Sequence, residues 1–560
     1  MAGLGIQELF TSISPKFNSR ESEDVVQSLK RNYGGKFNSM DDQGLLPCLQ
    51  LLEKHGFVSD NHLTLIEDFV TPKSNQKEQV KEMINSFKES RQQQVDPERE
   101  FPGRQKELEE IMEKLETKGQ SPVVNLFGSA GVGKTTLAKN VCSKWQGKQF
   151  VVDLRRAKDM REIYLSMMSS LGLTVPIAYV DQNYVVTQIH EEVQSLNQSV
   201  LFLLDNVEQF TAGQGKEGEK LKTAFVHFLV RLSEFDGKDK KTSLSLLVTS
   251  RTQLQDAYIS KVCNFELNCL GSSFSEEILI SKGRINVNSH QKNELINISK
   301  GIPLLLKGLA AILRQERKSV DDLIAEVQKG KGATPKKSKW EEDVKEKQLN
   351  FEEEGLDIGQ LSAIMEMFNT LPTDSLKVSA VSVSLFCAPF SASTAAKIFG
   401  LSLSDTLVQL EGLVASAIIS VVNEEAKEVM YDIHPLLRKY ADSIKEDAKF
   451  HMAYLEAKGR FYQHFMAKME KIAKLIDPDY VRAFQMFEND RANYEFTLEI
   501  SLQPDYFIVP REFQENALIA SLFNAMLTED KQMHLFHSWA EMCEDDGQSG
   551  RGPAVTPLCS

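Results

Sequence analysis

Apolar side chains recur three or four positions apart along residues 1–93, which is the spacing of amphipathic helices. Segments with this spacing begin at Ile6, Val25, Leu45, Leu63 and Gln76. A short helix buries its apolar stripe only by packing against its neighbours. The pattern therefore predicts a compact α-helical bundle over residues 1–93.

The pattern changes within residues 94–270, where, after a polar linker, short apolar runs alternate with amphipathic helical segments. The apolar runs that predict buried strands are Val123–Phe127, Phe150–Leu154, Val200–Leu204 and Leu244–Thr249. The segments that predict helices between them are Asp159–Leu171, Tyr184–Leu196 and Leu221–Leu232. This alternation predicts an α/β domain with a mostly parallel sheet and helices on both faces.

The rest of the chain is predicted to be mainly helical. Residues 271–335 are expected to form a helical domain and residues 336–355 a charged linker. Residues 450–540 carry many aromatic side chains and are expected to form packed helical hairpins. The tail, residues 541–560, contains Gly and Pro and is expected to be disordered.

Residues 356–449 combine helical segments with two apolar runs, Ile418–Val422 and Val429–Ile433, that predict a β-hairpin. This order of elements is typical of a winged-helix domain, a fold that often binds DNA. The segment carries 12 acidic and 7 basic residues, a net charge of −5, whereas a DNA-reading surface needs basic side chains. We therefore expect this domain to regulate the protein itself.

The overall composition is that of a globular, acidic protein. Its 560 residues are 41% hydrophobic and carry a formal net charge of −14, which argues against broad binding to nucleic acid or acidic membranes. The seven cysteines form no CxxC pair, as expected in a reducing compartment. No signal peptide and no stretch of membrane-spanning length is recognisable. We therefore expect a cytoplasmic protein without a membrane span.

One motif follows the first predicted strand directly and opens the next helix. It is the Gly-x-x-x-x-Gly-Lys-Thr pattern of a phosphate-binding loop. Glycines let the backbone turn tightly and direct its N–H groups at phosphate oxygens, and the helix adds the positive end of its dipole. Lys134 is expected to reach the terminal phosphates, and the Thr135 hydroxyl to bind Mg²⁺. The residues predicted to bind nucleotide here are Gly128, Ser129, Ala130, Gly131, Val132, Gly133, Lys134, Thr135 and Thr136.

Two later strands also end in side chains with suitable chemistry. The third predicted strand is followed by Asp205, which is expected to hold hydrated Mg²⁺ together with Thr135. The fourth leads to Arg251, which is expected to contact a terminal phosphate. A helix cap at Asp205 and an exposed loop arginine at Arg251 are the alternatives. Lys134, Asp205 and Arg251 are the candidate catalytic residues.

Hydrolysis also requires a group that orients or deprotonates water. Asn206 follows Asp205, where a second acid often stands, and an amide cannot act as a base. Glu208 is the candidate substitute. The sequence therefore predicts at most a slow ATPase.

Taken together, these motifs resemble those of the STAND class of NTPases, and specifically its NB-ARC branch. That branch includes plant disease-resistance proteins and the animal apoptotic protease-activating factors. The resemblance covers roughly residues 100–450 and follows the order of the family. The matching segments are Phe101-Pro102-Gly103-Arg104, Gly128 to Thr136, Leu201 to Asp205, Thr249-Ser250-Arg251, Gly301-Ile302-Pro303-Leu304 and Ile433-His434-Pro435.

The resemblance implies that the cofactors are ATP and ADP, with Mg²⁺. It also implies contacts that the phosphate loop alone does not suggest. By resemblance, Phe101, Gly103 and Arg104 contact adenine and ribose, and Pro303 packs on the base. His434 falls at the position of the family's winged-helix histidine, which contacts the β-phosphate of ADP and holds the closed state.

Two weaker resemblances concern the ends of the chain. Residues 41–69 resemble the later helices of a death-effector domain, although the Arg-x-Asp-Leu-Leu signature of that family is missing. An unrelated helical adaptor or cap is the alternative. The helical region after residue 450 resembles the start of a TPR-type repeat array, which the chain is too short to complete.

These resemblances imply a nucleotide-controlled signalling switch in apoptosis or innate immunity. ADP would hold the closed state, and the open state would form a homo-oligomer. Clustered domains of residues 1–93 would then recruit a death-fold adaptor or a caspase-like protein. A STAND-class transcription regulator that binds DNA through the winged helix is the main alternative. A metabolic phosphotransferase and a constitutive or inhibitory short form are the others.

Overall fold

In the computed structural model the described residues are 6–33, 45–54, 58, 63, 65–92, 103–116, 122–155, 157–173, 181–211, 215–237, 242–254, 262–283, 287–328, 356–423, 428–476, 478–503, 522, 526–527 and 531–539. The predictions for Phe101, for the linker 336–355 and for the tail 541–560 lie outside them. The chain divides into two compact units, and each is described separately. One unit comprises Met1–Lys106, Ser129–Gly133 and Asn268–Arg460, and the other Glu107–Gly128, Lys134–Leu267 and Phe461–Ser560.

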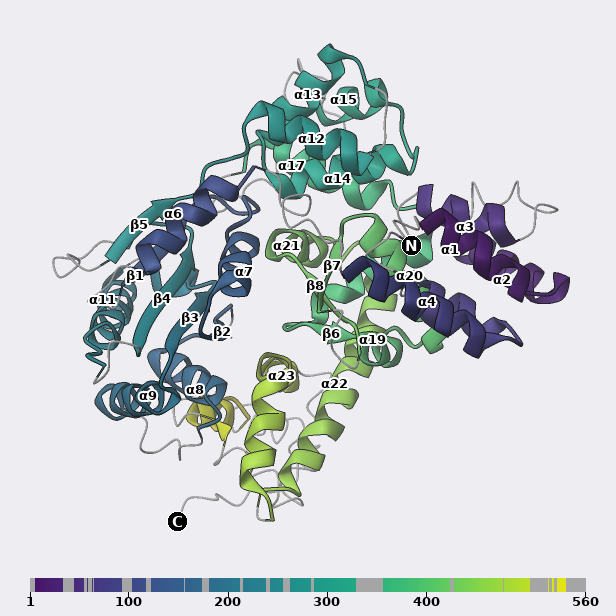
Figure 1. Ribbon diagram of the computed structural model, residues 1–560. Coiled ribbons are helices and arrows are strands. Elements are labelled where there is room, and N and C mark those ends of the chain that lie inside the picture. Colours follow the sequence, from purple (N-terminus) through teal and green to yellow (C-terminus); the bar gives the residue numbers. More distant parts are fainter. Residues whose placement is uncertain are drawn as a thin grey trace. The chain divides into compact units, whose positions relative to one another are not determined.

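A parallel sheet forms the centre of the second unit (Figure 1). Its strands are β1 (Val123–Phe127), β2 (Lys148–Asp153), β3 (Ser199–Asp205), β4 (Ser243–Ser250) and β5 (Val262–Glu266). They lie in the order β2-β3-β4-β1-β5, and every neighbouring pair is parallel, which confirms the predicted sheet. The sequence did not predict β5, because this edge strand mixes polar with apolar residues and lacks a continuous apolar run.

The register of the sheet places the carboxyl ends of its strands at one edge. Asp153 of β2 lies opposite Asp205 of β3, and Phe127 of β1 lies opposite Ser250 of β4. In an open α/β sheet, ligands bind at this edge, outside the ends of the strands. The carboxyl ends of β1, β3 and β4 therefore lie together at the edge where the motifs predict a phosphate site.

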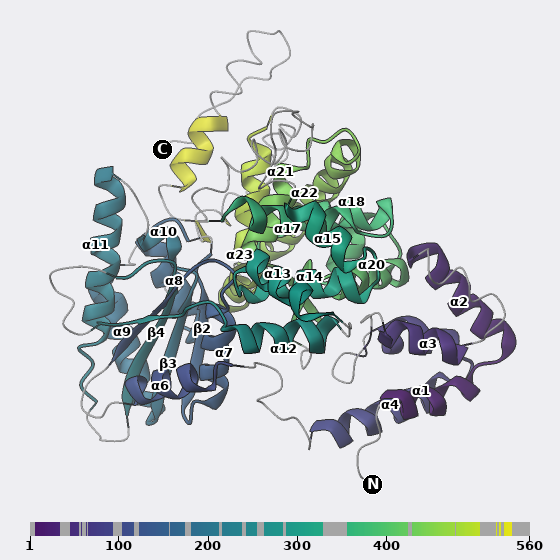
Figure 2. The same cartoon turned by 90° about the horizontal axis from the view of Figure 1, so that it is seen from above.

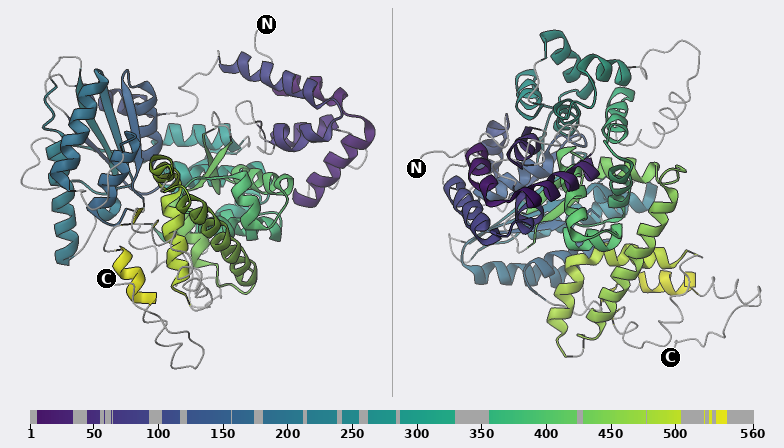
Figure 3. Two further views of the ribbon diagram at one scale, coloured as in Figure 1. Left: turned by 90° about the horizontal axis from the view of Figure 1, so that it is seen from below. Right: turned by 90° about the vertical axis from the view of Figure 1, so that its right-hand side faces the viewer.

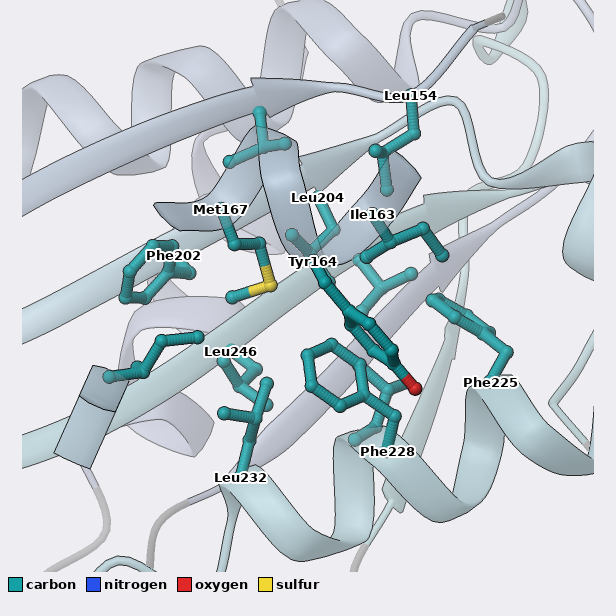
Figure 4. Close-up of a cluster of buried hydrophobic side chains, with 14 of the residues drawn as sticks. Leu154, Ile163, Tyr164, Met167, Phe202, Leu204, Phe225, Phe228, Leu232 and Leu246 are labelled. Atoms are coloured by element: carbon teal, nitrogen blue, oxygen red, sulfur yellow. The ribbon is translucent and has the colours of Figure 1, made fainter. Parts of the chain in front are cut away.

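Helices cover both faces of this sheet, as the alternating pattern predicts. They are α6 (Gln105–Leu115), α7 (Lys134–Lys144), α8 (Met160–Ser170), α9 (Gln182–Leu196), α10 (Glu208–Thr211) and α11 (Gly215–Leu232). Helix α7 lies on the face opposite α9 and α11 (Figure 2). The apolar core between α8, α9, α11 and the sheet includes Phe202, Leu204 and Leu246 of the strands (Figure 4). In this core the centroids of the Tyr164 and Phe228 rings are 4.8 Å apart.

The helices after residue 450 belong partly to the same unit. They are α22 (His451–Ala473), α23 (Tyr480–Ser501) and a helix over residues 531–539. The ammonium of Lys531 lies 2.8 Å from Glu495 of α23 and also pairs with Glu162 of α8. A buried ionic cluster therefore joins the last helices to α8. The assignment of this region to a TPR-type array stays a prediction.

The first unit contains a group of helices that follows the sheet in sequence. Its members are α12 (Ser272–Gly283), α13 (Ser289–Ser299), α14 (Pro303–Arg314), α15 (Val320–Gln328) and α17 (Ile358–Asn369). Helix α17 packs against α13, α14 and α15, although the predicted 356–449 domain includes it. The approach to α14 is close, because a β-carbon on Gly308 would lie 2.3 Å from the sulfur of Met367. Glycine at 308 is therefore required by packing.

The remaining elements of residues 356–449 combine helices with a small antiparallel sheet. They are α18 (Asp374–Ser382), a 3₁₀ turn (Val383–Leu385), β6 (Phe390–Ser391), α19 (Ala392–Phe399), α20 (Leu403–Ala415), β7 (Ile419–Asn423), β8 (Met430–Ile433) and α21 (Pro435–Ser443). The sheet order is β6-β8-β7, and β7 and β8 are the strands of the predicted hairpin. The winged-helix assignment itself stays a prediction. Within the described residues no single helix is long and apolar enough to cross a membrane, although α19 and α20 pass that test as a pair bent by 104°.

The amino-terminal residues are helical, as predicted (purple in Figure 3). Their elements are α1 (Ile6–Ile13), η1 (Ser14–Lys16), α2 (Ser19–Tyr33), α3 (Leu45–Lys54), η3 (Leu65–Val70), η4 (Thr71–Lys73) and α4 (Lys77–Gln92). Their apolar core, which includes Phe10, Leu49 and Phe69, also takes in Val408 and Ala415 of α20. This bundle therefore packs on α20 within the first unit, and its kinship to death-effector domains stays a prediction.

Truncation of a core aromatic tests the packing of α11 on the sheet. Phe228→Ala removes a fully buried ring and should lower the free energy of unfolding of the α/β domain by about 3–5 kcal/mol. Urea unfolding followed by circular dichroism measures the loss. Tyr184→Ala, at an exposed aromatic on α9, is the matched control and should change it by less than about 0.5 kcal/mol. Equal effects of the two variants would contradict this description of the core.

Candidate functional site

The phosphate loop connects β1 to α7 through left-handed backbone conformations. The φ angles of Gly131 and Gly133 are +77° and +104°, values that residues with a β-carbon rarely adopt. Helix α7 begins at Lys134, so its amino-terminal N–H groups belong to the loop. The ammonium of Lys134 donates to the carbonyl oxygen of Gly128 at 2.8 Å, and the side chain is buried. A cation and the positive end of a helix dipole thus converge at the loop, which suits a polyphosphate.

The hydroxyl of Thr135 and the carboxylate of Asp205 meet beside this loop. Thr135 Oγ1 donates to Asp205 Oδ1 at 2.9 Å. Within the described residues no group of three or more His, Cys, Asp or Glu side chains is placed to hold a metal ion. Mg²⁺ commonly needs only one or two carboxylates, because phosphate oxygens and water complete its octahedral shell. This hydroxyl and carboxylate therefore fit the predicted Mg²⁺ ligands. A bound Mg²⁺ would help to neutralise the charge of the phosphates.

Four neighbouring side chains surround the carboxylate of Asp205. Thr249 of β4 donates its hydroxyl to the same carboxylate oxygen as Thr135, while the Asn206 side-chain amide donates to the other at 3.0 Å. The pKa of Asp205 is raised by burial and then by the charge of Asp153, and the two threonine hydrogen bonds oppose this rise. The sequence alone did not single out Thr249 or Asp153. Their positions at the ends of adjacent predicted strands were the available signal.

Asn206 adopts a left-handed backbone with φ of +63°, which asparagine tolerates better than most residues. Its backbone N–H donates to Thr249 Oγ1 at 2.9 Å, and its side chain also reaches Asp153 at 3.4 Å. Asn206 therefore links the ends of β2, β3 and β4. Its role here is to position the carboxylates.

Arg251 and Glu208 lie together, and Glu208 is close enough to Lys134 to feel its charge. Arg251 Nε is 3.9 Å from Glu208 Oε1. Burial raises the pKa of Glu208, against the opposing charges of Lys134 and Arg251. A carboxyl group with a raised pKa next to these cations has the chemistry of a general base or of an orienting group for water. The geometry therefore keeps Glu208 as the candidate for that role.

A buried polar network that the sequence did not predict holds the loop after β4. Asn125 lies in the middle of β1, where it donates to Asn264 Oδ1 of β5 at 2.8 Å. Ser250 donates its hydroxyl to Asn125 Oδ1, also at 2.8 Å. Asn264 in turn binds both the N–H and the carbonyl group of Leu254. The network fixes the backbone on both sides of Arg251. A single polar residue in the apolar run Val123–Phe127 was its only sequence signal.

On the first unit, Arg104 braces the phosphate loop. Its buried guanidinium donates to the carbonyl oxygen of Asn268 at 2.5 Å and lies 3.5 Å from that of Val132. Gly103 has φ of +79°, and a β-carbon there would overlap the ring of Phe274 at 2.4 Å. Both predicted residues thus have a structural role in the loop's surroundings. Their contact with adenine or ribose stays a prediction.

The predicted Gly-x-Pro segment also contacts the loop. Pro303 occupies the first turn of α14, where its missing N–H costs no hydrogen bond. The next N–H, of Leu304, donates to the carbonyl oxygen of Gly131 at 3.4 Å. A β-carbon on Gly131 would lie 3.1 Å from Ile302 and 3.2 Å from Leu304. The absence of a side chain at Gly131 therefore permits the approach of α14.

His434 caps the helix that follows the hairpin. Its Nδ1 accepts a hydrogen bond from the backbone N–H of Leu436 at 3.2 Å, at the first turn of α21. This contact fixes the ring orientation and leaves the proton on Nε2 in the neutral form. Its contact with a β-phosphate, like the contact of Arg251 with a terminal phosphate, stays a prediction.

Comparison with known families bears on the same region. The family description "NB-ARC domain" matches residues 104–214, which include the phosphate loop and Asp205. This match supports the resemblance of the chain to P-loop NTPases of the NB-ARC type. The match does not extend to Arg251, Pro303 or His434, so the roles of these three residues rest on sequence resemblance and geometry.

Solved structures similar to this chain share little sequence with it. A STAND protein with a tetratricopeptide repeat sensor from Pyrococcus horikoshii is 15% identical with a TM-score of 0.42, and the alignment covers 80% of this chain. The chain spans 65% of the length of that protein. A Walker-type ATPase from Pyrococcus abyssi is 13% identical with a TM-score of 0.32, over 60% of this chain and 95% of the other. These TM-scores carry no functional argument. No curated protein matches the chain significantly.

The variant Asp205→Asn should change the stability of the NB-ARC domain and its nucleotide affinity in opposite directions. Since the folded domain raises the pKa of Asp205, the stability linked to this group is fully present below its unfolded pKa and is lost as pH rises through its folded pKa. The asparagine variant should therefore melt at a higher temperature than the wild type at pH 7 without nucleotide, and the difference should shrink in acid.

The same variant should lose Mg²⁺-dependent nucleotide affinity by at least about tenfold, because a neutral amide is a poor ligand for Mg²⁺. Thermal unfolding between pH 4 and pH 8 and calorimetric titration measure the two effects. Asp181→Asn, at the amino-terminal cap of α9, is the control for removing one carboxylate from the same domain. A lower melting temperature of Asp205→Asn at pH 7 would contradict the assigned electrostatics.

Proposed function

We propose that this protein is a signal-transduction switch that binds ATP and ADP with Mg²⁺. The observation that supports the proposal best is the hydrogen bond from Leu304 to the carbonyl oxygen of Gly131. It joins the phosphate loop to α14, a helix outside the nucleotide-binding sheet. A change of loop conformation with the bound nucleotide would therefore act directly on the helical domain.

The switch requires two states with different nucleotide affinity, because a ligand shifts an equilibrium only by that difference. In the proposal, ADP stabilises the closed state through the phosphate loop, Pro303 and His434. ATP, or an upstream signal, favours an open state. Pro303 and His434 lie in elements that follow the sheet in sequence, so a nucleotide that contacts them would hold several elements together.

Hydrolysis is proposed to be slow. Asn206 positions the neighbouring carboxylates and offers no base, so Glu208 is the residue proposed to orient water. Slow turnover suits a switch, because the lifetime of the ATP state then sets the duration of the signal.

Assembly and recruitment complete the proposal. The open form is proposed to self-assemble, and clustered domains of residues 1–93 to recruit a death-fold adaptor or a caspase-like protein in apoptosis or innate immunity. Clustering raises the local concentration of weak binding sites, so no single tight contact is needed. The protein is proposed to act in the cytoplasm. The net charge of −5 over residues 356–449 argues against the DNA-binding alternative.

The proposal is tested by purifying the protein without added nucleotide, denaturing it and identifying what is released. We expect near-stoichiometric ADP from the wild type and none from Lys134→Ala. Losing charge-assisted hydrogen bonds to phosphate should weaken binding about 10- to 100-fold. Lys144→Ala, at the other end of α7, is the control and should retain nucleotide. A Lys134→Ala protein that keeps its nucleotide would contradict the proposed site.

His434→Asn tests the proposed closed state. Asparagine is a good helix cap and can still accept from Leu436, but it lacks the imidazole. We expect this variant to assemble spontaneously in the presence of ADP, as measured by light scattering after size-exclusion chromatography. His290→Asn, at an exposed histidine on α13, should remain unassembled. A monomeric His434→Asn protein would remove His434 from the switch.

A further inference from the structure

Helix α14 spans the first unit from the phosphate loop to α20. At its amino-terminal end, Leu304 donates to the carbonyl oxygen of Gly131. Its 12 residues correspond to about 18 Å of helix. The helix is buried along most of its length and in close contact with Met367 of α17. A displacement at one end is therefore transmitted to the other, since a packed helix moves as a rigid body.

At the other end, two arginines hold the carboxyl terminus of α20. Arg314 Nη2 donates to the carbonyl oxygen of Ala415 at 3.0 Å, and Arg317 Nη2 donates to the hydroxyl of Ser416 at 2.5 Å. Ala415 is the last residue of α20, and Ser416 is its cap. Helix carboxyl termini carry partial negative charge, so two cations are stabilising there. We call Arg314, Arg317, Ala415 and Ser416 the arginine clasp.

The burial of the Arg317 charge in the clasp carries an energetic cost. Burial and the nearby charge of Arg314 lower the pKa of Arg317 to about 9, but the guanidinium stays charged at neutral pH. Among the described residues, its Nε and Nη1 atoms are buried without hydrogen-bond partners. The bond to Ser416 is thus its principal compensation. A buried charge with so few partners is compensated only while its remaining hydrogen bond is intact. The bond from Arg317 to Ser416 is therefore either fully formed or released.

Helix α20 also carries the amino-terminal bundle. Val408 and Ala415 belong to the apolar core of that bundle, and α20 lies against α2 and η3. Ala415 therefore contacts both the clasp, through its carbonyl oxygen, and the bundle, through its side chain. A shift of the end of α20 would disturb the packing of residues 65–70 on it.

We propose that the arginine clasp couples the phosphate loop to the amino-terminal bundle, so that the bundle stays docked on α20 only while Arg314 and Arg317 hold the end of that helix. The coupling runs from Gly131 through α14 and the clasp to Ala415. It rests on the proposed function only for its trigger, the bound nucleotide. Arg314 and Arg317 are positioning residues, because they act on the bundle through α20.

Hydrogen–deuterium exchange of the full chain tests the coupling. In the wild type with ADP, residues 65–70 and 403–415 should be protected, and replacement of ADP by a non-hydrolysable ATP analogue should raise their exchange. In Arg314→Ala/Arg317→Ala, exchange there should be about tenfold faster with either nucleotide, the size expected when a charge-assisted hydrogen bond is lost. The double variant should keep its nucleotide. Lys307→Ala removes an exposed cation from the same helix and should behave as the wild type.

A milder variant keeps the proposal testable if the double variant does not fold. Ser416→Ala removes the acceptor of Arg317 and the hydrogen bond that the same hydroxyl donates to the carbonyl oxygen of Gly412, but it leaves both arginines in place. It should raise exchange of residues 403–415 and 65–70 in the same direction. Wild-type exchange at residues 65–70 in both clasp variants would overturn the proposal. A wild-type protein that binds no nucleotide would overturn the proposed function instead, and the clasp would then be judged by comparing the variants with the wild type without nucleotide.

Discussion

Parallel pairing of the strands in the central sheet is the constraint on which the site depends. Because β2 and β3 run in register to Asp153 and Asp205, two carboxylates are placed side by side at the end of the sheet. The neighbouring strand brings Thr249 to the same point. Like charges so close, and partly removed from water, oppose folding unless a cation or a proton compensates. The raised pKa of Asp205 is the sign of that opposition, and in the proposed switch a bound Mg²⁺ would provide the compensation.

The side chains around the Asp205 carboxylate are polar, and its oxygens accept hydrogen bonds from them. Thr135, Thr249 and Asn206 each donate to Asp205. These contacts come from the first turn of α7, from β4 and from the residue that follows β3, so the carboxylate links three elements. Stability and function are therefore opposed at Asp205, as is common at sites that bind charged ligands.

The contacts of the phosphate loop with residues outside the sheet are the basis of the proposed switch. Gly131 allows α14 to approach closely, and the guanidinium of Arg104 holds the carbonyl of Val132. A simple phosphotransferase would not need a long helical segment against its phosphate loop. In the proposed switch, α14 is the element that senses the loop, and the arginine clasp at its far end passes the change to α20. In this proposal, packing along α14 transmits the movement, and the buried charge of Arg317 makes the change abrupt.

The sequence by itself determined the parallel sheet, its order of strands and helices, the phosphate loop, and Asp205 as its partner. These features follow from local patterns, because apolar runs specify buried strands and the glycine motif specifies a backbone conformation. It did not determine β5, Thr249, the Asn125 network or the ionic cluster around Lys531. Each of these depends on side chains that are distant in sequence, and the pairing partner is visible only after folding. The same holds for α17, which packs with helices on the other side of a predicted linker, and for Ala415, whose contacts with Arg314 and with the amino-terminal bundle only the tertiary structure decided.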